Sequence, residues 1–257
     1  MKNVKVTASI VTYNSRRVID GVLKSLRCSN CSCDLETVVV DNKSTDDTVD
    51  YISKMYPEVR IIQNQINAGY GRANNKALSA SDSDYFFVIN PDIEFDEDLI
   101  QKAVDYLEAN PDIVLANPDI KSPEGKRKYP PKALPALHYI LPRVVKWKNP
   151  LFDKWRREYT YQTRFREEPF EVEVCSGSFM MCRTSALKAV GGFDERFFLY
   201  YEDLDLSRMM AQKGRIVCNP GLSVRHVGAR EAHHSKTAGN YMIQSAFKYF
   251  NKWGWKI

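Results

Sequence analysis

The first half of the chain alternates between continuous apolar runs and segments with helical spacing. Four apolar runs are typical of buried strands: residues 4–12, 36–41, 59–64 and 85–90. The segments between them repeat apolar side chains every three or four residues, which predicts helices over residues 15–26, 44–56 and a short one ending at residue 78. Strands that are apolar on both faces and separated by helices favour a parallel sheet covered on both sides.

Polar side chains follow each of these apolar runs directly. Because ligands of such sheets bind beyond the carboxyl ends of the strands, we expect one binding site at that edge. For the residues after the first two strands, simple helix caps are the alternative interpretation. The candidate residues are Thr12, Tyr13, Asn14, Asp41, Asn67, Gly69, Gly71, Arg72, Asn90 and Asp92.

Two of the strand ends suit a nucleotide diphosphate. Asp41 ends a run of valines, and a carboxylate there can accept hydrogen bonds from a nucleobase or a ribose. The segment after the third strand lacks the Gly-Lys-Ser/Thr ending of a P-loop. Gly69 and Gly71 can still bring backbone N–H groups to a diphosphate, and Arg72 can bring a guanidinium.

The fourth strand ends abruptly at Asn90-Pro91-Asp92. Proline cannot donate to the strand ladder and fixes the backbone, so Asp92 is held at the strand tip. Its carboxylate there can bind a hard divalent cation, Mg²⁺ or Mn²⁺. An Asx-type turn that only ends the strand is the alternative.

A second group of carboxylates lies at Glu202, Asp203 and Asp205. Mutual repulsion and burial would raise the pKa of one of them, as general acid–base chemistry requires. A helix is expected to begin near Leu204, so Asp203 and Asp205 can instead simply complement a helix N-terminus.

The charge of the protein is unevenly spread. The 257 residues carry a formal charge of +5, but residues 121–168 alone hold thirteen Lys and Arg against five Asp and Glu. Such a basic segment suits phosphate, an acidic membrane surface or nucleic acid. The segment is also aromatic, which favours an acceptor-binding or interfacial role: Tyr129, Tyr139, Trp147, Trp155, Tyr159 and Tyr161.

Three further features bear on location and cofactors. With no charged-then-apolar leader and no apolar stretch of about 18 residues, we expect a cytoplasmic protein. The tail, residues 241–257, interleaves apolar residues with lysines, and it can either lie on a membrane surface or dock on the core as a terminal helix. Cys28, Cys31 and Cys33 have no second Cys/His pair nearby, so we expect reduced thiols rather than a zinc site.

Several motifs together resemble glycosyltransferase family 2, the inverting enzymes of the GT-A fold. The Asn-Pro-Asp motif, in place of Asp-x-Asp, is similar to bacterial rhamnosyltransferases, and residues 175–214 resemble the family's acceptor-side region. The resemblance covers about residues 4 to 230. The motifs of the first half are Thr12-Tyr13-Asn14, Asp41-Asn42-x-Ser44-x-Asp46, Asn67-x-Gly69-x-Gly71-x-x-Asn74 and Asn90-Pro91-Asp92.

The resemblance implies an α/β fold of the Rossmann-like GT-A type, with a mostly parallel central sheet flanked by helices and a smaller acceptor-side subregion. It also implies a single catalytic domain over residues 1–257. Residues 1–120 would form the nucleotide-sugar-binding half and residues 121–230 the acceptor-side half with its basic aromatic insert. Residues 231–257 would form a helical tail.

The resemblance further assigns roles at the site. Asp203 corresponds to the catalytic base, and Gly177, Ser178 and Glu202 to the acceptor side. Asp92 and His226 correspond to the metal ligands. Asn90 stands where the family's metal motif has its first acid, so only Asp92 carries over from that motif as an anionic ligand. The ten strand-end residues correspond to the donor site.

The function that follows is an inverting, metal-dependent transfer of L-rhamnose from dTDP-rhamnose to a lipid-linked oligosaccharide or cell-surface polysaccharide. The acceptor would be a glycan or a polyprenyl-diphosphate-linked sugar, reached at the inner face of the cytoplasmic membrane, and no nucleic acid is expected as a partner. A UDP-hexose or UDP-N-acetylhexosamine donor is the alternative. A nucleotidyltransferase, from a different class, would want glycine directly after the first strand, and the sequence has none there. A non-catalytic binding module would not need Asp92, Asp203 and His226 together.

Overall fold

The central sheet begins with four parallel strands. The computed structural model describes residues 3–128, 131–136, 138–139, 149–228 and 236–255. Within them, β1 (Lys5–Thr12) pairs in parallel with β2 (Asp34–Asp41) and β4 (Tyr85–Ile89), and β2 pairs with β3 (Arg60–Gln63). These are the four predicted strands, and their residues are buried most fully in β1 and β4, which lie inside the sheet. The predicted α/β class is confirmed.

The second half of the sheet is mixed. Strand β8 (Phe179–Arg183) runs antiparallel between β4 and β6 (Ile113–Lys121), and β6 is parallel to β9 (Arg215–His226). Two short strands, β5 (Ile93–Glu94) and β7 (Phe170–Glu171), pair antiparallel with β9. In the described part of the chain this gives a nine-stranded sheet of order β3-β2-β1-β4-β8-β6-β9-β5, with β7 beside β9.

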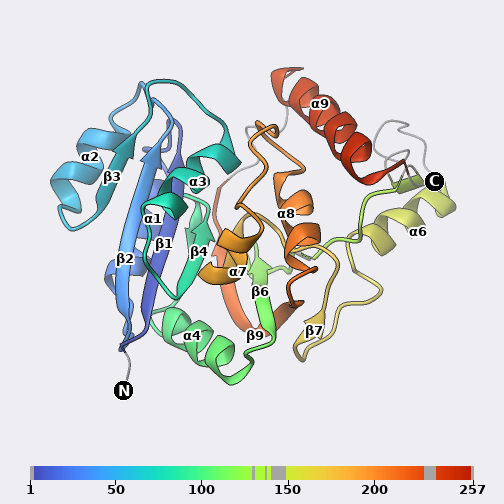
Figure 1. Ribbon diagram of the computed structural model, residues 1–257, viewed down its shortest axis with the longest axis horizontal. Helices are drawn as coiled ribbons and strands as arrows, with labels where there is room; N and C mark the ends of the chain where they lie inside the picture. Colours follow the sequence, from blue (N-terminus) through green and yellow to red (C-terminus); the bar gives the residue numbers. More distant parts are fainter. Residues whose placement is uncertain (1–2, 129–130, 137, 140–148, 229–235, 256–257) are drawn as a thin grey trace.

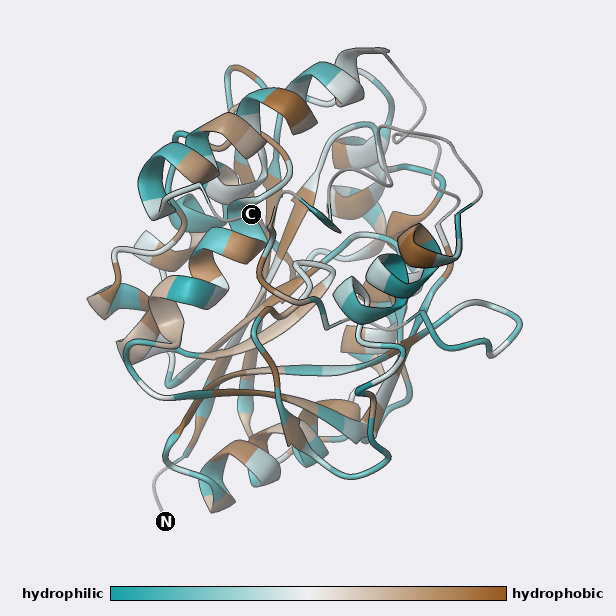
Figure 2. Cartoon of the chain, turned by 90° about the vertical axis from the view of Figure 1, so that its right-hand side faces the viewer, coloured by the Kyte–Doolittle hydropathy of each residue, from teal (hydrophilic) through white to brown (hydrophobic). Residues whose placement is uncertain are grey.

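Helices cover both faces of this sheet (Figure 1). Their buried side chains form one apolar cluster on each face, and Figure 2 shows the hydrophobic residues concentrated on the central strands. Within the described residues no helix is both long enough and apolar enough to cross a bilayer. The helices are α1 (Ile19–Arg27), α2 (Thr48–Met55), α3 (Tyr70–Ser79), α4 (Leu99–Ala109), α6 (Pro150–Tyr159), α7 (Thr184–Ala189), α8 (Glu202–Met210) and α9 (Lys236–Trp253).

Two predicted helix starts are wrong by four residues. Helix α2 begins at Thr48 and not at Ser44. The Ser44 N–H instead donates to an Asp41 oxygen at 2.9 Å, and the Thr48 N–H donates to Asp46 at 3.1 Å. Helix α1 begins at Ile19, because the Ser15 carbonyl accepts from the N–H groups of Val18 and Ile19 in a turn. The polar residues before both helices therefore form hydrogen bonds within the preceding loops and are not part of the helices.

The tail docks on the core as helix α9. Tyr249 and Phe250 are buried in a third apolar cluster that includes Phe197, Tyr201 and Leu204. Figure 1 shows α9 lying across one end of the molecule, next to α8. Three large apolar side chains are about half exposed here. Ile243 and Phe247 belong to α9, and Trp255 follows it.

Candidate active site

The residues at the carboxyl ends of β1 and β2 are hydrogen-bonded to one another and to the loops that follow. Asp41 is only 2% exposed and accepts a hydrogen bond from the Thr12 hydroxyl at 3.0 Å, besides that from Ser44. Asn14 has a left-handed backbone (φ 54°), and its side-chain oxygen accepts from the Thr45 N–H at 2.7 Å. Tyr13 is 52% exposed and leaves an open aromatic face at this edge. Thr12 and Asp41 thus fix the loops, while Tyr13 is available to a ligand.

The glycine segment after β3 owes its glycines to close packing. A Cβ on Gly69, whose φ is +87°, would lie 2.4 Å from the Phe198 carbonyl oxygen, and one on Gly71 would lie 2.9 Å from the Phe193 Cβ. The Gly69 N–H already donates to Asn67 at 3.1 Å. These glycines let α3 approach the loop of residues 193–198, and their contact with a diphosphate stays a prediction.

Arg72 is paired with a carboxylate of the loop of residues 193–198. Its Nε lies 3.2 Å from a Glu195 carboxylate oxygen, and its side chain is 59% exposed. An exposed pair of this kind contributes little to stability, so a stronger anion could displace Glu195. The assignment of Arg72 to the donor diphosphate stays a prediction.

Asp92 and His226 are brought together although 134 residues separate them. Strand β5 follows Asp92 directly and pairs Ile93 with His226, so the His226 Nε2 lies 2.9 Å from the Asp92 Oδ2. The Asp92 Oδ1 is buried without a hydrogen-bond partner among the described residues. A Cβ on Gly228 would lie 1.9 Å from the Asp92 Oδ2, so only glycine lets the chain pass here. Sequence reasoning missed Gly228, although a Gly two residues after the candidate ligand His226 was the available signal.

The donor set fits a divalent cation. An orphaned carboxylate oxygen beside an imidazole offers one hard oxygen ligand and one nitrogen ligand to Mn²⁺ or Mg²⁺. Among the described residues no group of three or more His, Cys, Asp or Glu side chains could hold a metal ion. A cation bound by Asp92 and His226 would therefore take its remaining ligands from phosphate and water.

Tyr70 lies between Asn90, which is next to this pair, and the Gly177 loop, and sequence reasoning missed it. Its hydroxyl lies 2.9 Å from the Asn90 Oδ1 and 2.8 Å from the Gly177 carbonyl oxygen. Desolvation raises the pKa of Tyr70 well above its usual value, with the charge of Glu202 adding to the effect. Because the phenol stays protonated, its single O–H can donate to either of these oxygens, and the hydroxyl lies between the strand tip at Asn90 and the loop at Gly177.

Asp203 is held at the start of α8 by backbone N–H groups. Its Oδ2 accepts from the Gly177 N–H at 3.1 Å, and its Oδ1 accepts from the Leu204 N–H at 3.0 Å. Two successive left-handed residues, Tyr200 and Tyr201 (both φ 67°), turn the chain into the helix. Left-handed non-glycine residues cost about 1–3 kcal/mol each and cluster at functional sites. The turn aims Asp203 at the small-residue segment that holds Ser178.

Glu202 is the carboxyl group of this cluster with a raised pKa. Burial raises its pKa to about 8, and the neighbouring charge of Asp203 adds to the shift. Its Oε2 has no hydrogen-bond partner among the described residues. At neutral pH Glu202 is therefore mostly a neutral acid, while Asp203 accepts the hydrogen bond from the Gly177 N–H.

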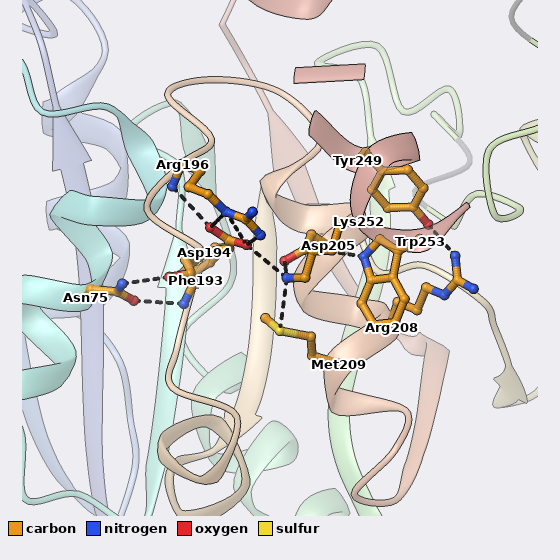
Figure 3. A network of polar contacts seen from close by, with 10 residues as sticks. All are labelled: Asn75, Phe193, Asp194, Arg196, Asp205, Arg208, Met209, Tyr249, Lys252 and Trp253. Carbon is orange, nitrogen blue, oxygen red and sulfur yellow. Dashed lines mark hydrogen bonds and ion pairs between the residues drawn. The ribbon is translucent and has the colours of Figure 1, made fainter. Parts of the chain in front are cut away.

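Asp205 does not join this pair but anchors the tail. Figure 3 shows its carboxylate with Lys252 and Trp253 of α9: the Lys252 Nζ lies 2.8 Å from Oδ2 and the Trp253 Nε1 donates to Oδ1 at 2.6 Å. The same lysine lies 2.9 Å from Asp194 in the loop before α8. Asn75 of α3 holds that loop through two 2.8 Å hydrogen bonds to the Phe193 backbone. Helices α3, α8 and α9 are thereby joined behind the site.

Comparison with known proteins agrees with this geometry. The model of the family described as "Glycosyl transferase family 2" matches residues 7–191. The chain belongs to this family. It is 31% identical to an N-acetylglucosaminyl-diphospho-decaprenol L-rhamnosyltransferase of Mycobacterium tuberculosis H37Rv, over 88% of this chain and 80% of that protein. It is 28% identical to the rhamnosyltransferase WbbL of Escherichia coli K12, over 70% and 69% of the two chains.

Solved structures of low identity show the same fold. Staphylococcus aureus TarS 1–349 in complex with UDP-GlcNAc superposes with a TM-score of 0.67 at 19% identity, covering 96% of this chain and 67% of that one. The mannosyltransferase PcManGT from Pyrobaculum calidifontis, in complex with GDP-Man and Mn²⁺, gives 0.66 at 19%, covering 97% and 65%. This chain spans about two thirds of the length of each. The fold is GT-A, and the protein is a glycosyltransferase. The alternative prediction of a nucleotidyltransferase is therefore wrong.

Proposed function

We propose that this glycosyltransferase transfers L-rhamnose from dTDP-rhamnose to an acceptor sugar linked to polyprenyl diphosphate, with inversion at the anomeric carbon. The observation that carries the proposal is that the candidate metal site and the candidate base lie on either side of the Tyr70 hydroxyl. The Tyr70 hydroxyl lies within hydrogen-bonding distance of Asn90, next to Asp92, and of Gly177, whose N–H donates to Asp203. A donor bound at one side and an acceptor at the other would meet between them.

Asp92 and His226 are assigned to a divalent cation, Mg²⁺ or Mn²⁺. When bound, the ion neutralises the charge that develops on the leaving diphosphate. The orphaned Asp92 Oδ1 and the adjacent imidazole support this assignment. The assignment is also supported by PcManGT, a protein of the same fold whose structure contains GDP-Man and Mn²⁺.

Asp203 is assigned as the general base. In the reaction the acceptor oxygen forms a bond to the anomeric carbon, the bond from that carbon to the diphosphate oxygen breaks, and the hydroxyl proton passes to Asp203. One displacement of this kind inverts the anomeric centre without a covalent sugar–enzyme intermediate. The two backbone N–H groups that donate to Asp203 keep its carboxylate in one orientation for the acceptor.

The donor nucleotide is assigned to the edge formed by β1 and β2. The open ring of Tyr13 can stack on a base, while Asp41, Asn14 and Thr12 hold the loops beneath it. A rhamnose donor is supported by the Asn-Pro-Asp motif and by two relatives whose names specify rhamnosyl transfer. The UDP-GlcNAc and GDP-Man of the two solved structures are the competing donors to test.

A lipid-linked acceptor is supported by the name of the mycobacterial relative, which specifies a diphospho-decaprenol. It implies work at a membrane surface, and helix α9 and the segment after it offer Ile243, Phe247 and Trp255 for contact with lipid. Aromatic side chains of this kind favour the headgroup region. We therefore extend the proposal to peripheral association with the cytoplasmic membrane.

The deciding experiment measures transfer with a panel of nucleotide sugars and the anomeric configuration of the product by NMR. Asp203→Asn keeps the shape of the side chain but removes its basicity, so transfer should fall about 10²-fold or more while donor affinity changes little. Asp82→Asn, an equal change at an exposed surface carboxylate, is the matched control. A product that retains the donor's configuration, or near-wild-type transfer by Asp203→Asn, would overturn the mechanism.

A further inference from the structure

The basic insert sends one lysine to the catalytic base. The Lys132 Nζ lies 3.9 Å from the Asp203 Oδ2. The backbone of Lys132 is fixed, because its N–H donates to the Val174 carbonyl at 3.2 Å. Its side chain is 32% exposed, so part of it is accessible to a ligand.

The ammonium group of Lys132 is under-used. At 3.9 Å its contact with Asp203 is too long for a hydrogen bond, and in the described part of the chain it forms no other ion pair or hydrogen bond. Partly exposed ion pairs without hydrogen bonds contribute little to stability. The charge of Lys132 also offsets part of the rise that burial causes in the pKa of Glu202, but among the described residues neither carboxylate hydrogen-bonds to the ammonium.

A second lysine of the insert, Lys128, is already occupied beside the candidate metal ligands. The Lys128 Nζ donates to the His226 carbonyl oxygen at 3.0 Å, next to the pair assigned to the metal. The two lysines thus stand four positions apart along the insert, one beside His226 and one beside Asp203. The open ammonium is the one on the acceptor side.

We propose that Lys132 binds the phosphate attached to the acceptor sugar. This inference rests on the proposed function. The acceptor hydroxyl must come within hydrogen-bonding distance of Asp203, so a phosphate on the same sugar lies within one ring of the base and within reach of the Lys132 ammonium. Lysine binds phosphate as a point charge through up to three N–H donors.

Proton transfer adds a second reason. When Asp203 takes the acceptor proton, it loses the negative charge that faces Lys132. A phosphate on the acceptor would keep the lysine paired at that moment, whereas a neutral acceptor would leave the cation without a partner. Lys132 should therefore favour acceptors that carry a phosphate beside the reacting sugar.

The test compares two synthetic acceptors that differ in one feature. One is N-acetylglucosaminyl diphosphate on a short prenyl chain, and the other is the same sugar as an alkyl glycoside without phosphate. For Lys132→Ala we expect the KM for the diphosphate acceptor to rise about tenfold or more, the range for a lost charged hydrogen bond, and the KM for the glycoside to change little. Lys132→Arg, which keeps the charge, should restore most of the affinity.

The control is Lys126→Ala, an equal change at an exposed lysine of the same insert. Thermal unfolding of each variant checks that the fold is kept. Equal losses on both acceptors, with a shifted pH profile of kcat, would mean that Lys132 only tunes Asp203 and would overturn the inference. Wild-type kinetics of Lys132→Ala on both acceptors would also overturn it.

The two levels of the proposal fail differently. If the wild type transfers sugar to the diphosphate acceptor and Lys132→Ala does so equally well, only the assignment of Lys132 is wrong. If the wild type uses neither acceptor with any donor of the panel, the proposed function falls, and the inference falls with it.

Discussion

Ionising the buried Glu202 should destabilise the fold, and this can be measured directly. The side chain is 7% exposed, and its Oε2 has no partner among the described residues. Glutamine has nearly the shape of the protonated acid and never ionises. Glu202→Gln therefore isolates the cost of the charge.

The direction and the size of the change in the free energy of unfolding follow from the pKa of Glu202. Burial, with the charge of Asp203 second, raises the pKa of Glu202 from 4.5 to about 8 in the folded protein. Between these two values the unfolded chain has lost the proton while the folded chain keeps it, so the free energy of unfolding falls as pH rises. The slope is about 1.4 kcal/mol per pH unit, and the contribution, complete below about pH 4.5, is gone above about pH 8. The total loss is on the order of a few kcal/mol.

The assay is urea unfolding of wild type and Glu202→Gln at several pH values between 5 and 9. Other titrating groups cancel in the difference between the two proteins. The variant should match the wild type near pH 5 and exceed it by a few kcal/mol near pH 9. Glu97→Gln, at an exposed glutamate, should show no such divergence. Parallel stability curves for wild type and Glu202→Gln would refute the reasoning.

Three further predictions concern the metal, the tail and the membrane. Asp92→Ala and His226→Ala should each lower transfer and blunt its response to Mg²⁺ or Mn²⁺, and EDTA-insensitive turnover by the wild type would contradict the metal assignment. Lys252→Met leaves the fully buried Asp205 without its cation, so thermal unfolding should come several degrees lower than for the exposed-site control Lys213→Met, whereas equal midpoints would count against the anchor. Ile243→Ser combined with Phe247→Ser should weaken binding to anionic lipid vesicles without changing donor affinity, and unchanged vesicle binding would exclude this face of α9.

The strands and their polar ends could be predicted from the sequence because both depend on local pattern. Continuous apolar runs identify β1 and β4, and the register of parallel strands places Thr12 beside Asp41. The helix starts were missed for a related reason. Ser44 looks like a cap by sequence, but its N–H and hydroxyl bond to Asp41 across the loop, and sequence spacing does not reveal that competition.

Contacts between distant segments were beyond the sequence. Strand β8 lies antiparallel between β4 and β6. Its direction could not be predicted, because the apolar pattern of a buried strand is the same for parallel and antiparallel pairing. Tyr70, Gly228 and Lys132 matter through what they touch across the fold, and each looks ordinary in its own segment. Motif resemblance supplied Asp203 and His226, for which spacing alone favoured a helix cap and a structural histidine.

The tail packs against the helix that carries the proposed base, although it lies outside the matched family region. Asp205 follows the proposed base, Asp203, by two residues on the same short helix, and Lys252 and Trp253 of α9 bind its carboxylate. The left-handed turn at Tyr200 and Tyr201 costs energy, and such a turn persists only where packing over-determines it. Tyr249 of α9 supplies part of that packing, with its ring centroid 5.6 Å from that of Tyr201. We therefore expect the orientation of Asp203 to depend on the docking of α9, so that a membrane bound to the outer side of this helix would act on the element that positions the proposed base.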